Sequence, residues 1–141
     1  MNSPISSNPQ CTSSCVLYIC TSCRTKGTPR EPSTNRQGFA LYQELKSLIK
    51  TSSIQENVDI QPAKCLSVCP RPCGIALSSS DSWTYLFGDQ KPHETAHDIL
   101  KCVALYLQSP KGFMQRSIRP RSLQGSILGR IPPIIGEDKC T

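Results

Sequence analysis

The amino-acid sequence predicts one α/β domain, in which two parallel strands joined by a helix are followed by a hairpin and a second helix. Two short strand-like runs each lead to a cysteine, two segments repeat apolar residues at helical spacing, and a polar turn separates two further β-rich runs. A chain of 141 residues suits a single core. We expect a disordered leader over 1–14, the domain over 15–112 and a basic tail over 113–141.

The first half of the chain contains a strand, a long loop and a helix. Residues 1–14 are rich in Ser, Pro and Asn and show no apolar period, which is typical of disorder. The run CVLYIC at 15–20 is apolar and β-rich, so we expect a strand that is buried on both faces. An irregular loop rich in Gly, Pro and Ser follows. Apolar positions in FALYQELKSLIK then predict a helix over about 36–51.

The second half supplies two strand signals, a hairpin and another helix. In VDIQPAKC, Val58 and Ile60 alternate with polar residues, which predicts a half-buried strand that leads to Cys65. GIALSSS and WTYLFG, separated by a polar turn, predict an antiparallel hairpin whose aromatic residues fill the core. Pro92 favours a helix start there, and apolar residues continue at helical spacing to Leu107. Within the tail we expect one short helix around Leu123, Ile127 and Leu128.

This element order is a thioredoxin-like layout: strand, helix, strand, strand, strand, helix. A strand–helix–strand unit forms a right-handed parallel crossover, and the hairpin adds antiparallel strands to the same sheet. Functional groups of such sheets gather beyond the carboxyl ends of the parallel strands. We therefore expect the cysteines after both strands to meet at one edge.

Five of the nine cysteines form two closely spaced groups. Cys20 and Cys23 have C-x2-C spacing, and Cys65, Cys69 and Cys73 have C-x3-C-x3-C spacing. Two such loops provide the four thiolates of a tetrahedral zinc ion or an iron–sulfur cluster. The leader lacks the pattern of a secretory signal, which predicts a cytoplasmic protein in which structural disulfides are rare. Metal ligation is therefore favoured over a disulfide framework, although spacing alone does not choose the metal.

Two resemblances favour an iron–sulfur cluster. From Leu17 to Gly112 the chain resembles the thioredoxin-like 2Fe-2S ferredoxins, in which the first strand ends in a cysteine and a C-x3-C loop, here Cys65 to Cys69, follows the second. The segments ICTSCR, CLSVCPRPCGIAL, WTYLFGD and GRIPP also resemble a family of small uncharacterised proteins catalogued as predicted metal-binding. The first resemblance implies that Cys20, Cys65 and Cys69 are cluster ligands. Cys23 or Cys73 would be the fourth, because Pro32 and Ser33 occupy the region of the family's second cysteine.

The predicted function is that of a metal-binding protein and not of an enzyme. It would be a small ferredoxin-like electron carrier or accessory protein with a 2Fe-2S cluster. Two alternatives are a zinc- or cobalt-handling protein, which the resemblance links to cobalamin metabolism, and a thiol oxidoreductase that uses Cys20 and Cys23. No nucleotide-hydrolase, serine-esterase or zinc-protease motif is present. His93 and His97 have helical i, i+4 spacing, but without a third ligand nearby we expect exposed helix residues.

The charge pattern indicates the kind of partner. The net charge is +6, and residues 110–141 contain six Lys or Arg against Glu137 and Asp138. Such a segment attracts anionic surfaces, so we expect an acidic protein partner, such as a redox or metal-metabolism enzyme. Aromatic residues are scarce in the tail, which argues against nucleic acid. No apolar run is long enough to span a membrane, and a homodimer is left open.

Overall fold

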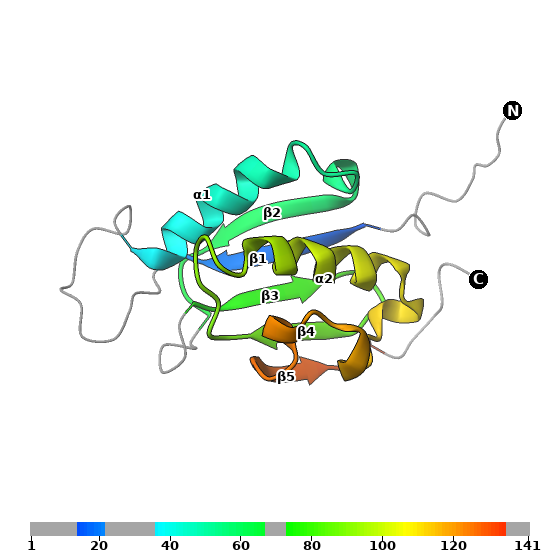
Figure 1. The fold of residues 1–141 in the computed structure, drawn as a ribbon. Helices are drawn as coiled ribbons and strands as arrows, with labels where there is room; N and C mark the ends of the chain where they lie inside the picture. The colour runs from blue at the N-terminus through cyan, green and yellow to red at the C-terminus, as the bar shows by residue number, and fades with distance from the viewer. Residues whose placement is uncertain (1–13, 22–35, 67–72, 135–141) are drawn as a thin grey trace, which may run out of the picture.

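The computed structural model describes residues 14–21, 36–66 and 73–134 (Figure 1). These residues form a five-stranded mixed sheet with two helices, and the strand order is β2-β1-β3-β4-β5. The strands are β1 (Cys15–Cys20), β2 (Val58–Ala63), β3 (Ile75–Ser78), β4 (Thr84–Phe87) and β5 (Ile127–Ile131), and the helices are α1 (Gln37–Ile49) and α2 (Ala96–Gln108). The predicted α/β class and the order of the first six elements are confirmed.

The pairing of the strands gives the sheet two distinct ends. β1 and β2 are parallel, with Cys20 opposite Ala63 in the register. β3 is antiparallel to β1, and β4 is antiparallel to β3, so β4 runs in the same direction as β1. The carboxyl ends of β1, β2 and β4 therefore lie together at what we call the cysteine end. β5 is antiparallel to β4 and finishes at the opposite end (Figure 1).

Only one face of β1 is fully buried, which differs from the predicted strand with two buried faces. Leu17 and Ile19 are completely buried, whereas Tyr18 between them is 37% exposed. The reason is that α1 and α2 contact each other and cover the same side of the sheet (Figure 1). Leu77 and Tyr85 continue the buried face across β3 and β4. The core is thus a single layer between this face and the two helices.

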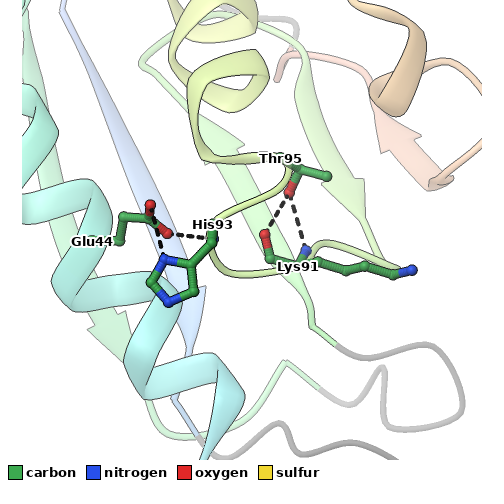
Figure 2. Close-up of polar contacts among 4 residues, drawn as sticks. All are labelled: Glu44, Lys91, His93 and Thr95. Atoms are coloured by element: carbon green, nitrogen blue, oxygen red, sulfur yellow. Dashed lines mark hydrogen bonds and ion pairs between the residues drawn. The ribbon is translucent and has the colours of Figure 1, made fainter.

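Helix α1 matches its prediction, but α2 begins at Ala96, after the predicted start near Pro92. The Thr95 hydroxyl accepts a hydrogen bond from the Lys91 N–H at 3.0 Å and donates one to the Lys91 carbonyl at 3.2 Å, which closes a turn before the helix (Figure 2). His93 lies in this turn at a positive φ of 68° and pairs with Glu44 of α1 at 3.3 Å. His93 is therefore not on a helix, and the predicted i, i+4 arrangement with His97 is wrong.

The C-terminal segment is also different from its prediction. The expected short helix around Leu123 and Ile127 is instead the short 3₁₀ turn Arg121–Leu123 followed by strand β5. Strand pairing with β4 accounts for this choice, because β4 would otherwise be the edge of the sheet. Met114 and Leu123 are fully buried in the core. The packed domain thus continues past residue 112, where the sequence analysis placed the start of a separate tail.

The same segment explains the burial of Cys102. Cys102 of α2 is buried, and its thiol donates to the Met114 sulfur at 3.8 Å. Residues 113–123 cover a side of α2 that a two-helix core would leave exposed. Within the part of the chain that the structure describes, no helix has the length and apolar character of a membrane span.

Candidate metal centre

Cys20 is placed by the last hydrogen bonds of β1. Its backbone N–H donates to the Gly74 carbonyl at 2.9 Å, which extends the β1–β3 ladder to the cysteine end. The side chain is buried, and its Sγ lies 4.0 Å from the carbonyl oxygen of Lys64. Lys64 immediately precedes Cys65, so the Cys20 sulfur lies against the peptide that leads into the second cysteine group.

Thr21 holds the ends of the two parallel strands together. Its N–H and its hydroxyl both donate to the Ala63 carbonyl, at 2.8 and 3.2 Å. Ala63 is the last residue of β2, and Cys65 follows two residues later as an exposed side chain. Lys64, whose side chain is exposed, precedes Cys65 in the chain, and a cation near metal-bound thiolates can offset their negative charge. Cys20 and Cys65 thus lie at the carboxyl ends of the two parallel strands, at the same edge of the sheet, as the topology predicted.

Cys73 lies at the same end of the sheet but in a different environment. Cys73 and Gln90 exchange two backbone hydrogen bonds of 3.1 Å, and the Cys73 side chain is buried. Strand pairing continues through Cys20 and Gly74, so side chains continue to alternate between the two faces. Cys73 therefore lies on the helix-covered face, as Ile75 does. Cys20 lies on the opposite face. Cys20 and Cys73 thus approach the cysteine end from different sides of the sheet.

The other two predicted ligands, Cys23 and Cys69, lie outside the described residues, as do the nearby cations Arg24, Lys26 and Arg71. Among residues 14–21, 36–66 and 73–134, no three His, Cys, Asp or Glu side chains are grouped so that they could hold a metal ion. A set of four thiolates would therefore need at least two ligands from residues such as 22–35 and 67–72, which lie outside the described part of the chain. Each of these two ranges carries a predicted ligand.

Cys15 and Cys102 do not belong to this site. Burial raises the pKa of each thiol to about 12, and the nearby Arg119 opposes the shift only at Cys102. A thiol with such a pKa is protonated at neutral pH, and the neutral thiol is a poor metal ligand and nucleophile. Cys15 also begins β1 and so lies at the end of the sheet opposite Cys20. Both side chains are part of the buried core.

Sequence reasoning missed Gln90, which is buried beside Cys73. Its amide nitrogen donates to the Gly88 carbonyl at 2.8 Å and to the Ser126 hydroxyl at 3.0 Å. Ser126 in turn donates to the Ser122 carbonyl at 2.7 Å, which ties the cysteine end to the segment before β5. The amide oxygen of Gln90 is buried and has no hydrogen-bond partner among the residues that the structure describes. No sequence pattern indicates this role, because a glutamine after a Gly-Asp turn is usually exposed.

Most of the chain matches the model of one protein family. Residues 17–133 match the model of a family described as a protein of unknown function, DUF1636. The chain belongs to this family. The match includes β5, in agreement with a domain that extends past residue 112. No functionally curated protein matches the DUF1636 chain.

Solved structures similar to this DUF1636 protein support the fold. The structure of a thioredoxin-like [2Fe-2S] ferredoxin from Aquifex aeolicus is 17% identical, with a TM-score of 0.57, and the match covers 87% of this chain and 98% of the ferredoxin. A cysteine-to-serine variant of a thioredoxin-like [2Fe-2S] ferredoxin from the same organism is 20% identical, with a TM-score of 0.51 and coverages of 68% and 91%. The predicted thioredoxin-like fold is confirmed.

Proposed function

We propose that this protein binds a 2Fe-2S cluster at its cysteine end and acts as a small ferredoxin-like electron carrier or accessory protein. The observation that supports this most is the contact of the Cys20 sulfur with the Lys64 carbonyl, next to Cys65. It occurs where two parallel strands end in a thioredoxin-like sheet, and the solved structures with a similar sheet include [2Fe-2S] ferredoxins. The role is therefore binding and not catalysis.

The proposed ligands are Cys20, Cys23, Cys65 and Cys69. Four thiolates are the usual donor set for a [2Fe-2S] cluster, and two cysteine loops at one sheet edge supply them. Cys23 is preferred over Cys73 because Cys73 is buried on the helix-covered face, opposite to Cys20, and is fixed by its backbone pair with Gln90. In this assignment Cys73 is not a ligand, and its buried side chain packs in the core at the cysteine end.

The residues of the chain would hold the cluster and set its surroundings. When bound, a [2Fe-2S] cluster accepts and releases one electron at a time. Burial of Cys20 keeps water from one side of the site, and the Thr21 hydrogen bonds to Ala63 fix the separation of the two strand ends. Lys64 supplies positive charge near the thiolates, which favours the reduced, more negative state.

The test is the metal and sulfide content of full-length protein purified without oxygen. We expect iron and acid-labile sulfide in equal amounts, a brown visible spectrum that dithionite bleaches, and an electron paramagnetic resonance signal after reduction. Zinc or cobalt without sulfide would instead establish the metal-handling alternative. Efficient reduction of insulin disulfides by the metal-free protein would establish the thiol oxidoreductase, and either result would overturn the proposal.

A further inference from the structure

The end of the sheet opposite the cysteines carries a surface of arginine and aromatic side chains. It includes Trp83, just before β4, Phe113 from the segment after α2 and Arg130 of β5, and the exposed Arg116 follows Phe113 three residues later in the chain. The Arg130 guanidinium carbon lies 5.0 Å from the ring centroids of both Trp83 and Phe113. The two rings meet edge to face, with centroids 5.5 Å apart. We call these four residues the arginine–aromatic surface.

Most of the positive charge on this side of the molecule is not paired with a carboxylate in the described part of the chain. Residues 110–134 include five Lys or Arg and no Asp or Glu. Lys111 pairs with Asp81 at 2.8 Å, and Arg119 is buried beneath the surface, over the Tyr85 and Phe87 rings. Arg116 and Arg130 are exposed, and in the described part of the chain neither is in a salt bridge. Burial lowers the pKa of Arg119, Cys102 and Tyr85 oppose this shift, and repulsion by Arg116 and Arg130 adds to it.

Apolar side chains are exposed around the same cations. Among the described residues, five large apolar side chains are exposed, and four of them lie in residues 113–134. These are Phe113 at 39%, Ile118 at 46%, Ile131 at 63% and Ile134 at 89%. Exposed Phe and Ile side chains, beside the half-buried Trp83 and exposed Arg, have the composition of energetically important interface residues. A solvated basic segment would not gather apolar side chains in this way.

The arginine–aromatic surface is also held in place before any partner binds. The Trp83 N–H donates to the Lys111 carbonyl at 2.8 Å, and the Tyr106 hydroxyl of α2 donates to the Trp83 carbonyl at 2.5 Å. Gly112 packs directly on the Tyr106 ring at a φ of 71°, where a β-carbon would come 2.5 Å from a ring atom. A preorganised surface loses little conformational entropy on binding.

We propose that the arginine–aromatic surface docks an acidic protein partner that also presents apolar side chains. Charge complementarity identifies the partner, because two exposed guanidinium groups without internal carboxylates favour Asp and Glu, while Phe113 and Trp83 supply apolar area. The surface lies across the sheet from Cys20, so a docked partner leaves the cysteine end accessible. This inference goes beyond the cluster proposal and does not depend on it.

Trp83 gives a direct test, because it is the only tryptophan of the chain. Full-length protein is titrated at physiological salt with a synthetic peptide of Glu, Asp, Leu and Phe, and separately with the same peptide carrying Lys at every acidic position. We expect a saturable change of Trp83 fluorescence with the acidic peptide alone. The variant Arg130→Glu should weaken binding at least about tenfold. The matched charge reversal Lys101→Glu, on the exposed side of α2, should change it less than about twofold.

Each other outcome of this titration overturns the proposal. The proposal fails if the acidic peptide gives no response. It also fails if Arg130→Glu and Lys101→Glu weaken peptide binding equally, because the peptide would then respond only to the overall positive charge of the protein. Tighter binding to phosphatidylserine vesicles or to a single-stranded oligonucleotide than to the peptide would assign the surface to a membrane or to nucleic acid. Iron and sulfide content is measured on the same samples, so loss of docking and loss of the cluster are seen separately.

Discussion

The two ends of the sheet are built in different ways. At the end that carries Trp83 and Arg130, hydrogen bonds and ring contacts between residues of the chain hold Trp83, Phe113 and Arg130 together. At the cysteine end, the strands place Cys20 and Cys65 at one edge, but the described residues do not form a complete ligand set. The difference teaches that the fold itself stabilises one end, whereas the other end provides donor atoms for a group that we propose binds there.

The largest effect on this contrast should come from Gly112. Replacing it with Ala forces a side chain into positive φ and against the Tyr106 ring, so Gly112→Ala should lower the free energy of unfolding by about 2–4 kcal/mol. Chemical denaturation of the metal-free protein measures this loss. Gly125→Ala is the matched control, because nothing lies within 4 Å of its added carbon. Equal effects of the two substitutions would show that the 110–134 segment is not packed as described.

A second effect, smaller for each pH unit, should appear in alkaline solution and comes from the two buried thiols of Cys15 and Cys102. Burial raises the pKa of Cys15 and of Cys102 from 9.0 to about 12, so the folded state holds these protons more tightly than the unfolded state. Their contribution to stability is therefore complete below pH 9 and is lost as the pH rises from about 9 to about 12. The slope should be on the order of 1 kcal/mol per pH unit for each thiol.

The variants Cys15→Ala and Cys102→Ala check the origin of that slope. Each should flatten the loss of unfolding free energy above pH 9, measured by denaturation of metal-free protein at a series of pH values. Cys65→Ala, which removes a thiol at an exposed position, serves as the control. If the unfolding free energy depended on pH identically in all three variants, the loss of stability above pH 9 would not come from the thiol protons of Cys15 and Cys102.

The sequence predicted the first six elements because their patterns are local. Helical spacing marks α1, and a strand pattern leads from Val58 toward Cys65. β5 was missed because Leu123, Ile127 and Leu128 fit a helix equally well, and only pairing with β4 decides between the two. The burial of Cys102 was missed for a related reason, since it depends on a segment 12 residues away.

The candidate site was predictable to the same extent. Strand ends and cysteine spacing were enough to bring Cys20 and Cys65 to one edge, because parallel strands end together. The different faces of Cys20 and Cys73 could not be predicted, since they depend on the register between β1 and β3. Neither could the burial of Gln90 or the stacking of Arg130 on Trp83, because each joins segments more than 30 residues apart.

One pair of variants tests the cysteine end most directly. Cys15 and Cys20 are both buried, at opposite ends of the same strand, so Cys15→Ser and Cys20→Ser make the same chemical change at two buried positions. Iron and acid-labile sulfide are measured after anaerobic purification. We predict that Cys20→Ser loses most of both, while Cys15→Ser keeps the content of the natural protein. Equal iron and sulfide in the two variants would contradict a cluster bound at the ends of β1 and β2.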